Sequence, residues 1–379
     1  MPAFAKRTIQ ENIMELYLWL GFLGIVFVML ALDLGVFNRK AHVMGIRESL
    51  GWTAVWVIMA LLFNVGVFYI YAYDIGGIDD HYHHHNIAAS DQTAPADNSN
   101  FKVGSYDAQR GKTAAIEYLT GYLVEKSLSL DNIFVISLIF SYFAIPPIFQ
   151  HRVLFWGILG ALILRGLMIF LGAELLEKFE WMIYFFAGML FVTAVKMLLA
   201  SNEEVNPDSN PAVVMARRIL PVSSGINGEH FFCRENGVLM MTPLFLALLV
   251  IETSDVIFAV DSIPAIFGIT NDPFLVFTSN IFALLGLRSL YFALAAMMDR
   301  FKYLKYSLIV ILLFVSFKMC AGGYFKDYIE ARNLKDVMTW ISLGVIVVAM
   351  AIGIIASLIA APKEPKAVTA EGTVEDIEK

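Results

Sequence analysis

Acidic residues lie inside apolar stretches of this sequence, where a membrane segment would place very few charges. Asp131 and Asp255 occupy equivalent places in two related segments, Asp-Asn-Ile-Phe-Val-Ile-Ser at 131–137 and Asp-Val-Ile-Phe-Ala-Val-Asp at 255–261. A charge at the bilayer centre costs about 2.5 to 3.5 kcal/mol on insertion scales, so such a carboxylate normally faces a partner, a cavity or a permeating ion. The repeated segment therefore indicates a membrane transport pathway built from a duplicated unit.

Helical spacing predicts which side chains of the first segment lie together. Glu125 and Asn132 are seven residues apart and share a helix face with Ser129 between them. Asp131 points about a third of a turn away from that face.

The second segment has a different arrangement of acids. Glu252 and Asp255 are three residues apart and share one side of a helix, whereas Asp261 lies nearly opposite Glu252. A straight helix cannot direct all three acids to one point, and Pro243 and Pro264 favour a kink or an unwound segment here. Such a break would free backbone carbonyls as further ligands.

Carboxylates, hydroxyls, an amide and carbonyls together form a hard, oxygen-rich set of ligands. Manganese, magnesium and calcium suit these oxygens, whereas copper(I) and zinc prefer thiolate or imidazole. An alternative is that the acids are structural partners of basic residues within the apolar stretches. We expect those basic residues to be structural or gating charges, and they are Arg165, Lys196, Arg288 and Lys318.

The duplication extends beyond the two acidic segments. The distance from the aspartate to a following arginine is 34 residues from Asp131 to Arg165 and 33 residues from Asp255 to Arg288. The distance from that arginine to a lysine is then 31 residues in the first unit and 30 in the second. Each unit spans the membrane three times, so the second must enter from the opposite side. We therefore expect two inverted repeats, as in many secondary transporters.

The composition requires a bilayer as the solvent for most of the chain. Of the 379 residues, 58% are hydrophobic and only 16% are charged, which is too apolar for a soluble globular protein. The net charge of −7 and the absence of a basic stripe argue against nucleic acid as a partner. Cys233 and Cys320 form no metal-binding or disulfide pattern. No catalytic motif is present either, so we expect a protein that is not an enzyme and carries no cofactor.

Apolar runs predict an all-α polytopic membrane protein with about nine transmembrane helices. The predicted spans lie near 15–37, 50–73, 114–143, 152–172, 180–200, 238–268, 274–298, 306–325 and 337–361. We expect the first run to be retained rather than cleaved as a signal peptide, because it carries Asp33 and lacks an A-x-A site.

Basic residues beside the spans predict the orientation, with the N-terminus outside and the C-terminus in the cytoplasm. The resulting organisation is an N-terminal helix pair (1–73), an outer loop (74–113), repeat 1 with spans 3–5 (114–200), a cytoplasmic loop (201–237), repeat 2 with spans 6–8 (238–325), a last helix (326–361) and a tail (362–379). Both long loops are predicted to be irregular, since they are rich in polar residues or proline.

The outer loop contains a second group of residues with metal-binding chemistry. Its histidines could collect transition metal ions, although histidine runs of low complexity are often incidental. They are His81, His83, His84 and His85.

Three motifs together resemble the TerC family of integral membrane proteins, and the Alx-like manganese exporters within it. They are Leu-Asp-Leu-Gly-Val-Phe at 32–37, Tyr-Leu-Thr-Gly-Tyr-Leu-Val-Glu-Lys-Ser-Leu-Ser-Leu-Asp-Asn at 118–132, and Glu-Thr-Ser-Asp-Val-Ile-Phe-Ala-Val-Asp-Ser-Ile-Pro-Ala at 252–265. The resemblance covers roughly residues 12–325. The histidine-rich loop is not part of the family pattern.

The resemblance implies export of a divalent cation, Mn2+, across the bacterial inner membrane. The pathway residues that it implies are Asp33, Glu125, Asp131, Asn132, Glu252, Asp255, Asp261 and Ser262. Both the identity of the metal and the direction of transport depend on the resemblance. Two alternatives stay open: a transporter of another substrate, such as Ca2+ or a tellurium oxyanion handled by the arginines, and a non-transporting membrane partner that helps to metallate exported proteins.

Overall fold

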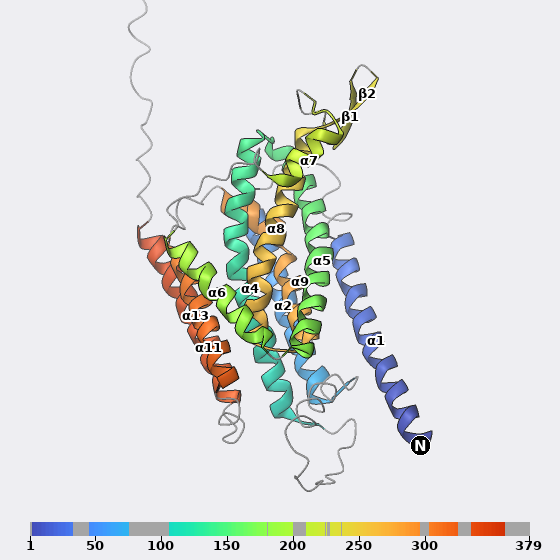
Figure 1. The fold of residues 1–379 in the computed structure, drawn as a ribbon, viewed down its shortest axis with the longest axis vertical. Coiled ribbons are helices and arrows are strands. Elements are labelled where there is room, and N and C mark those ends of the chain that lie inside the picture. Colours follow the sequence, from blue (N-terminus) through green and yellow to red (C-terminus); the bar gives the residue numbers. More distant parts are fainter. Residues whose placement is uncertain are drawn as a thin grey trace, which may run out of the picture.

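The structure, a computed structural model, is a bundle of long helices with one small β-hairpin at one end (Figure 1). It describes residues 2–32, 45–75, 106–179, 181–199, 210–223, 225, 228–235, 237–295, 303–324 and 335–360. The long helices lie side by side, and α7 and the hairpin extend beyond them at what we call the hairpin end of the bundle (Figure 1).

The elements follow one another along the chain with few strands. The helices are α1 (Pro2–Ala31), α2 (Ile46–Ala72), α4 (Ala108–Tyr142), α5 (Pro147–Lys178), α6 (Met182–Leu199), α7 (Pro211–Ile219), α8 (Pro243–Phe267), α9 (Pro273–Leu284), α10 (Leu287–Ala295), α11 (Leu304–Tyr324) and α13 (Lys335–Ala360). The strands β1 (Phe232–Glu235) and β2 (Val238–Met241) form an antiparallel hairpin.

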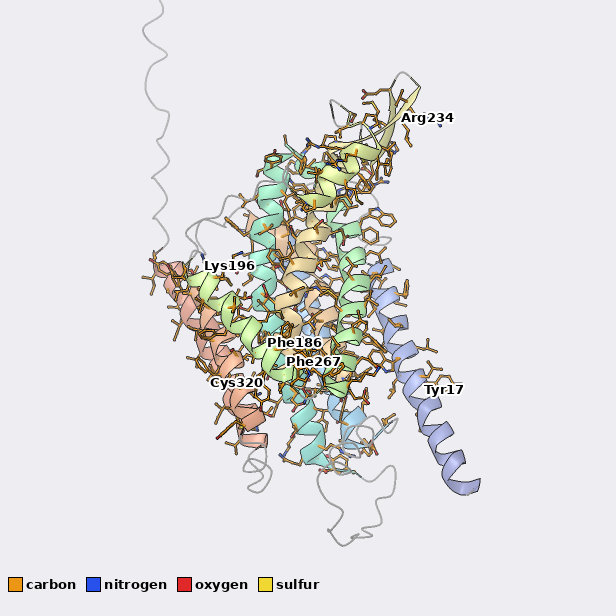
Figure 2. All side chains as sticks on the ribbon, in the orientation of Figure 1. Tyr17, Phe186, Lys196, Arg234, Phe267 and Cys320 are labelled. Atoms are coloured by element: carbon orange, nitrogen blue, oxygen red, sulfur yellow. The ribbon has the colours of Figure 1, made fainter. Side chains whose placement is uncertain are left out.

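The helices identify an integral multi-pass membrane protein. Within the described residues, six helices are long and apolar enough to cross a bilayer, and a bent pair, α9 with α10, raises the number to seven. The apolar part of α1 is shorter, at Leu16–Ala31, and α4 carries several charged residues along its length. Large hydrophobic side chains are exposed on the flanks of the bundle, including Tyr17 on α1 (Figure 2). The count of nine spans stays a prediction.

Local sequence explains where the central helices begin. Pro147, Pro243 and Pro273 each occupy the first helical turn, where the missing N–H of proline is no disadvantage. The carboxylates of Asp107 and Asp272 accept hydrogen bonds from backbone N–H groups at the starts of α4 and α9. These caps satisfy donors that would otherwise be left unpaired at the helix N-termini.

The helices around the centre pack in a regular set of pairs. Helix α4 lies along α2 and α9, and α5 lies along α8. Helices α6, α11 and α13 lie together on one side, where α6 pairs with α11 and α13 lies along both α11 and α4 (Figure 1). Helix α1 lies at the opposite edge, where the rings of Trp19 and Phe22 contact those of Phe274 and Phe277.

The predicted seventh span is a broken helix. Helices α9 and α10 meet at an angle of 42° around Leu285 and Gly286. Gly286 has a φ of +85°, and a Cβ atom there would lie 2.8 Å from three atoms of Trp56. Both the backbone conformation and the close approach of α2 therefore require glycine at this position.

Two predictions about the second half need correction. The segment 201–237 is not irregular throughout, because its described part contains α7 and β1, and the chain at 238–241 forms β2 instead of starting a membrane helix. The hairpin forms because Phe232–Glu235 pairs with Val238–Met241 across a turn at Gly237, whose φ is +83°. Of the kink or unwound segment expected near Pro243 and Pro264, the unwound segment is wrong, since α8 is helical from Pro243 to Phe267. The break lies in the following span.

At the end of the bundle opposite the hairpin, a partly buried acid joins α2 to the start of α9. The Tyr71 hydroxyl donates a hydrogen bond to Asp272 Oδ2. Asp272 lies in the connection between α8 and α9, and burial raises its pKa to about 7. The negative charge of Glu117 also raises this pKa, while the bonds from Tyr71, Leu275 N–H and Phe274 N–H lower it.

We predict that Asp272 makes the stability of the protein fall as pH rises from about 4 to about 7, because the carboxyl binds its proton more tightly in the folded than in the unfolded state. Asp272→Asn should flatten this pH dependence while keeping the helix cap, since asparagine caps helices as well as aspartate. Thermal unfolding of the purified protein across this pH range measures the effect. An equal slope in the variant and the wild type would contradict it.

Candidate buried ion-pair site

The centre of the bundle holds one arginine between two acids from different helices. The guanidinium of Arg165, on α5, donates from Nε to Asp255 Oδ2 at 3.1 Å and from Nη2 to Asp255 Oδ1 at 2.8 Å. Its Nη1 donates to Glu125 Oε1 on α4. Arg165 and Glu125 are fully buried, and the side chain of Asp255 is 12% exposed. The three side chains carry a formal net charge of −1.

Neutral oxygens complete the surroundings of this ion pair. Nη1 of Arg165 also lies 3.2 Å from Asn280 Oδ1 on α9 and 3.4 Å from Ser262 Oγ on α8. The second carboxylate oxygen of Glu125, Oε2, is buried and has no hydrogen-bond partner among the described residues. A buried acceptor without a partner is unusual, so this oxygen is available to a further ligand.

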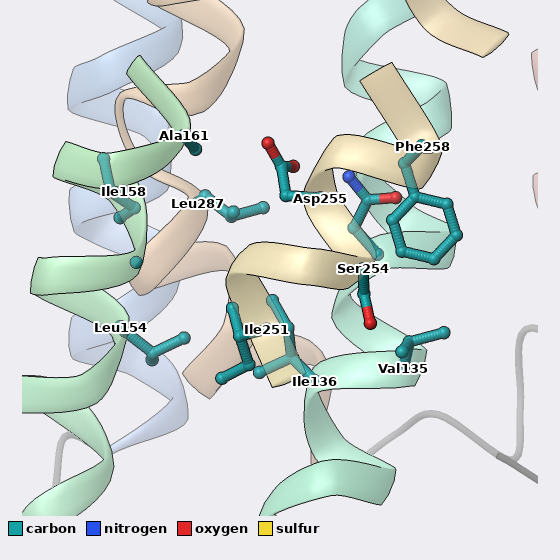
Figure 3. Close-up of a pocket in the computed structure, with 12 residues that line it drawn as sticks. Val135, Ile136, Leu154, Ile158, Ala161, Ile251, Ser254, Asp255, Phe258 and Leu287 are labelled. Atoms are coloured by element: carbon teal, nitrogen blue, oxygen red, sulfur yellow. The ribbon is translucent and has the colours of Figure 1, made fainter. Parts of the chain in front are cut away.

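A small pocket lies beside Asp255, on the side of the ion pair nearer to the hairpin end. It lies between α4, α5 and α8, and its wall is mostly apolar (Figure 3). Its α5 residues, from Leu154 to Ala161, precede Arg165 by one to three helical turns. The polar residues that line it are Asn132, Ser254 and Asp255. The pocket therefore connects the ion pair with the half of the bundle nearer to the hairpin.

Glu252 lies one turn before Asp255 and faces α5. A Cβ atom added at Gly160 would collide with the carboxylate of Glu252, so this acid occupies space that only a glycine leaves open. Its Oε2 is buried without a hydrogen-bond partner in the described part of the chain. The negative charge of Asp255 acts on it, but Glu252 is not part of the ion pair with Arg165.

Two predicted pathway acids lie away from the ion pair. Asp261 accepts a hydrogen bond from Thr193 Oγ1 of α6 at 2.7 Å, and the charge of Lys196 acts on it. Asp131 interacts electrostatically with Lys305 of α11. The adjacent Asn132 lines the pocket beside Asp255. The helical spacing predicted that Asp261 and Asp131 point away from Glu252 and Glu125, and their different partners agree with it; that Asp131 and Asp255 face one transport pathway stays a prediction.

Other predicted residues take structural places or lie outside the described residues. Asp33 and the histidines at positions 81, 83, 84 and 85 fall outside them. Arg288 is buried in α10, and Lys318 is partly buried in α11. Within the described ranges, no group of three His, Cys, Asp or Glu side chains is arranged to hold a metal ion. A metal ion at the centre would therefore be bound by two carboxylates, and its remaining ligands would be neutral oxygens.

The structure adds two central residues that the sequence did not single out. Asn280 is a buried amide within the apolar helix α9. An amide within such an apolar run could have marked it as a functional residue in the sequence. The Nζ of Lys126 donates to the backbone carbonyl of Ala283 at 3.1 Å, immediately before the break between α9 and α10. Lys126 could have been found in the same way, because it is a charged residue next to Glu125 in an apolar run.

We predict that Gly160→Ala destabilises the protein only modestly, by up to about 1.5 kcal/mol, because the new methyl group forces the flexible Glu252 side chain into a less favourable rotamer. Gly188→Ala on α6 is the matched control, since nothing lies within 4 Å of a Cβ there, and it should be neutral or slightly stabilising. Thermal or denaturant unfolding measures both. The double variant Gly160→Ala/Glu252→Ala should recover most of the loss; a loss that persists would mean that Glu252 is not the obstacle.

Comparisons with known proteins agree with this description of a membrane protein. Residues 110–365 match the family described as integral membrane protein TerC family. The chain is 45% identical over 348 residues to "Uncharacterized membrane protein STKORF319" of Myxococcus xanthus, covering 92% of this chain and 94% of that protein. It is 45% identical over 309 residues to "Putative membrane-bound redox modulator Alx" of Escherichia coli K12, covering 81% and 87% of the two chains. No solved structure matches the chain.

These matches extend over the helices that carry Glu125, Arg165 and Asp255. The family region begins near the start of α4 and includes Glu125, Asp255, Ser262 and Asn280, the described residues to which the guanidinium of Arg165 donates. A "Uncharacterized membrane protein" of Rickettsia bellii is also 39% identical over 341 residues, covering 90% of this chain and 97% of that protein. The chain belongs to the TerC family of integral membrane proteins.

Proposed function

We propose that this protein exports a divalent metal ion, Mn2+, from the cytoplasm across a bacterial inner membrane. The observation that carries the proposal is the pair of acids Glu125 and Asp255, which two different helices bring together at the buried centre. The unpartnered Glu125 Oε2 offers a ligand oxygen there. The proposed activity is transport, with the metal as substrate and no catalytic step.

The ligand chemistry favours a hard cation. Glu125 and Asp255 supply carboxylates, while Ser262 and Asn132 supply neutral oxygens close by. Oxygen ligands suit manganese, magnesium and calcium and do not by themselves choose among them. Manganese is proposed because of the resemblance to the Alx-like members.

The contacts of Arg165 favour a cation over an oxyanion as the substrate. In the described part of the chain, the guanidinium of Arg165 donates hydrogen bonds to oxygens of Glu125, Asp255, Asn280 and Ser262. An anion would have to compete with two carboxylates for the same guanidinium and would be repelled by the net charge of −1.

We also propose that transport uses alternating access between two inverted repeats of three spans. Helix α4 packs along α9 as α8 packs along α5, while α4 contacts α8 and α6 contacts α11. A twofold relation that exchanges α4 with α8, α5 with α9 and α10, and α6 with α11 would produce this set of pairs. The packing therefore supports the repeats predicted from the sequence.

The pocket and the packing on its far side support an inward-facing state. The pocket lies on the side of Asp255 nearer to the hairpin end, which the charge distribution predicts to be cytoplasmic. On the other side of the ion pair, a Cβ atom at Gly121 would lie 2.9 Å from Ser279 Oγ. The rings of Phe63, Tyr118 and Phe282 pack together nearby. Proton binding to the same carboxylates from the outer side would weaken the site and release the metal.

We predict that Asp255→Asn and Glu125→Gln each reduce Mn2+ flux at least tenfold in sealed vesicles that contain the purified protein. Each change removes a charged ligand, and a tenfold effect corresponds to only about 1.4 kcal/mol. Asp131→Asn should have a smaller effect, since Asp131 lies away from the ion pair.

Glu174→Gln is the control for the loss of an exposed acid on α5 and should transport normally. Equal flux in the wild type, Asp255→Asn and Glu125→Gln would overturn the site. Absence of flux in wild-type vesicles, for Mn2+ and for Ca2+ alike, would overturn the transport function.

We predict that Cys233, on β1, faces the cytoplasm. In a Cys320→Ser background, a membrane-impermeant maleimide should label Cys233 only after the cells are permeabilised, because the positive-inside rule puts the basic hairpin region inside. Cys233 is partly exposed and free, so it can react once the reagent reaches it. Labelling in intact cells would show the opposite orientation.

A further inference from the structure

Arg165 fills the place that a transported cation would have to enter. Its guanidinium is fully buried and makes a bidentate contact with Asp255. It also contacts Glu125, Asn280 and Ser262. Thus the two acids of the proposed site already hold a positive charge that is covalently part of the protein.

A divalent cation and this guanidinium cannot share the two carboxylates. The attraction that holds Arg165 in place is the same attraction that would hold the metal. With the metal bound between Glu125 and Asp255, Arg165 would face a double positive charge at close range in a poorly screened interior. The oxygens can therefore serve one of the two cations at a time.

A small pocket lies beside Asp255 in the direction in which Arg165 would withdraw, and it would have to widen to admit a guanidinium. The side chains of a helix lean toward its N-terminus, and the pocket beside Asp255 lies over the turns of α5 that precede Arg165. Small residues, Gly157 and Ala161, line it on that side. A guanidinium that leaves the carboxylates would find Asn132 Oδ1 or Ser254 Oγ in the same pocket.

We propose that Arg165 is a tethered competitor of the transported cation: it occupies Glu125 and Asp255 when the site is empty, yields them to the metal, and expels the metal when it returns. This inference rests on the proposed function and assigns a role to a residue that is not itself a metal ligand. The net charge of the three side chains is −1, whereas the two acids alone carry −2. Without the arginine, a divalent ion would be fully neutralised and slow to leave, and transport requires binding that is weak enough for release.

The test compares Mn2+ binding with Mn2+ transport in the purified full-length protein. In Arg165→Gln, we expect Mn2+ to bind at least tenfold more tightly by isothermal titration while the flux in vesicles falls, because the competitor is gone. Arg165→Lys keeps a positive charge and should bind Mn2+ within a few-fold of the wild type. Lys178→Gln removes an exposed cation from the same helix and should change neither quantity.

A milder variant keeps the inference testable if Arg165→Gln does not fold. Asn280→Ala retains Arg165 and both acids but removes one oxygen that holds the guanidinium, so Mn2+ should bind a few-fold more tightly. A separate readout is hydrogen exchange of α5 around Arg165 in the wild type, which should rise when Mn2+ is added.

Two outcomes distinguish a failure of the role proposed for Arg165 from a failure of the proposed transport function. If the wild type transports Mn2+ but both variants bind it equally well or more weakly, Arg165 organises the acids and does not compete with the metal. If the wild type neither binds nor transports Mn2+, the proposed function fails and the inference fails with it.

Discussion

The contact of Arg165 with Glu125 and Asp255 is the interaction on which the arrangement of the central helices depends. It joins α5 to α4 and α8, and Asn280 brings in α9. Two unit charges roughly 4 Å apart interact by about 4 kcal/mol at an effective dielectric constant near 20, against about 1 kcal/mol in water. Removing one member of such a buried pair typically costs about 3 to 5 kcal/mol, so the register of these helices follows from their charges.

Close packing around this polar centre depends on small residues. Gly160 leaves room for the Glu252 carboxylate, and Gly121 allows α4 to approach Ser279 of α9. Without a hydrophobic driving force between helices in lipid, small residues and polar contacts are what allow helices to associate closely. The glycines and the polar side chains therefore depend on each other, because Glu252 and Ser279 occupy the space that Gly160 and Gly121 leave open.

Much of the fold and part of the site follow from the sequence. The apolar runs located the long helices, and the three motifs identified the family. Helical spacing alone separated Asp261 from Glu252 and Asp131 from Glu125. The sequence could not show that Arg165 pairs with Glu125 as well as Asp255, because that contact joins residues 40 and 90 positions apart. It also placed the helix break at Pro264, whereas α8 tolerates that proline near its end and the break depends on Gly286 against Trp56.

The break at Gly286 also has a consequence for related sequences. A side chain at this position would require both an unfavourable backbone conformation and a gap where the ring of Trp56 now lies. A relative that replaces this glycine should therefore carry a smaller residue at the position of Trp56, or a straight helix in place of α9 and α10. Substitutions at these two positions should be correlated across the family, although they lie 230 residues apart in the chain.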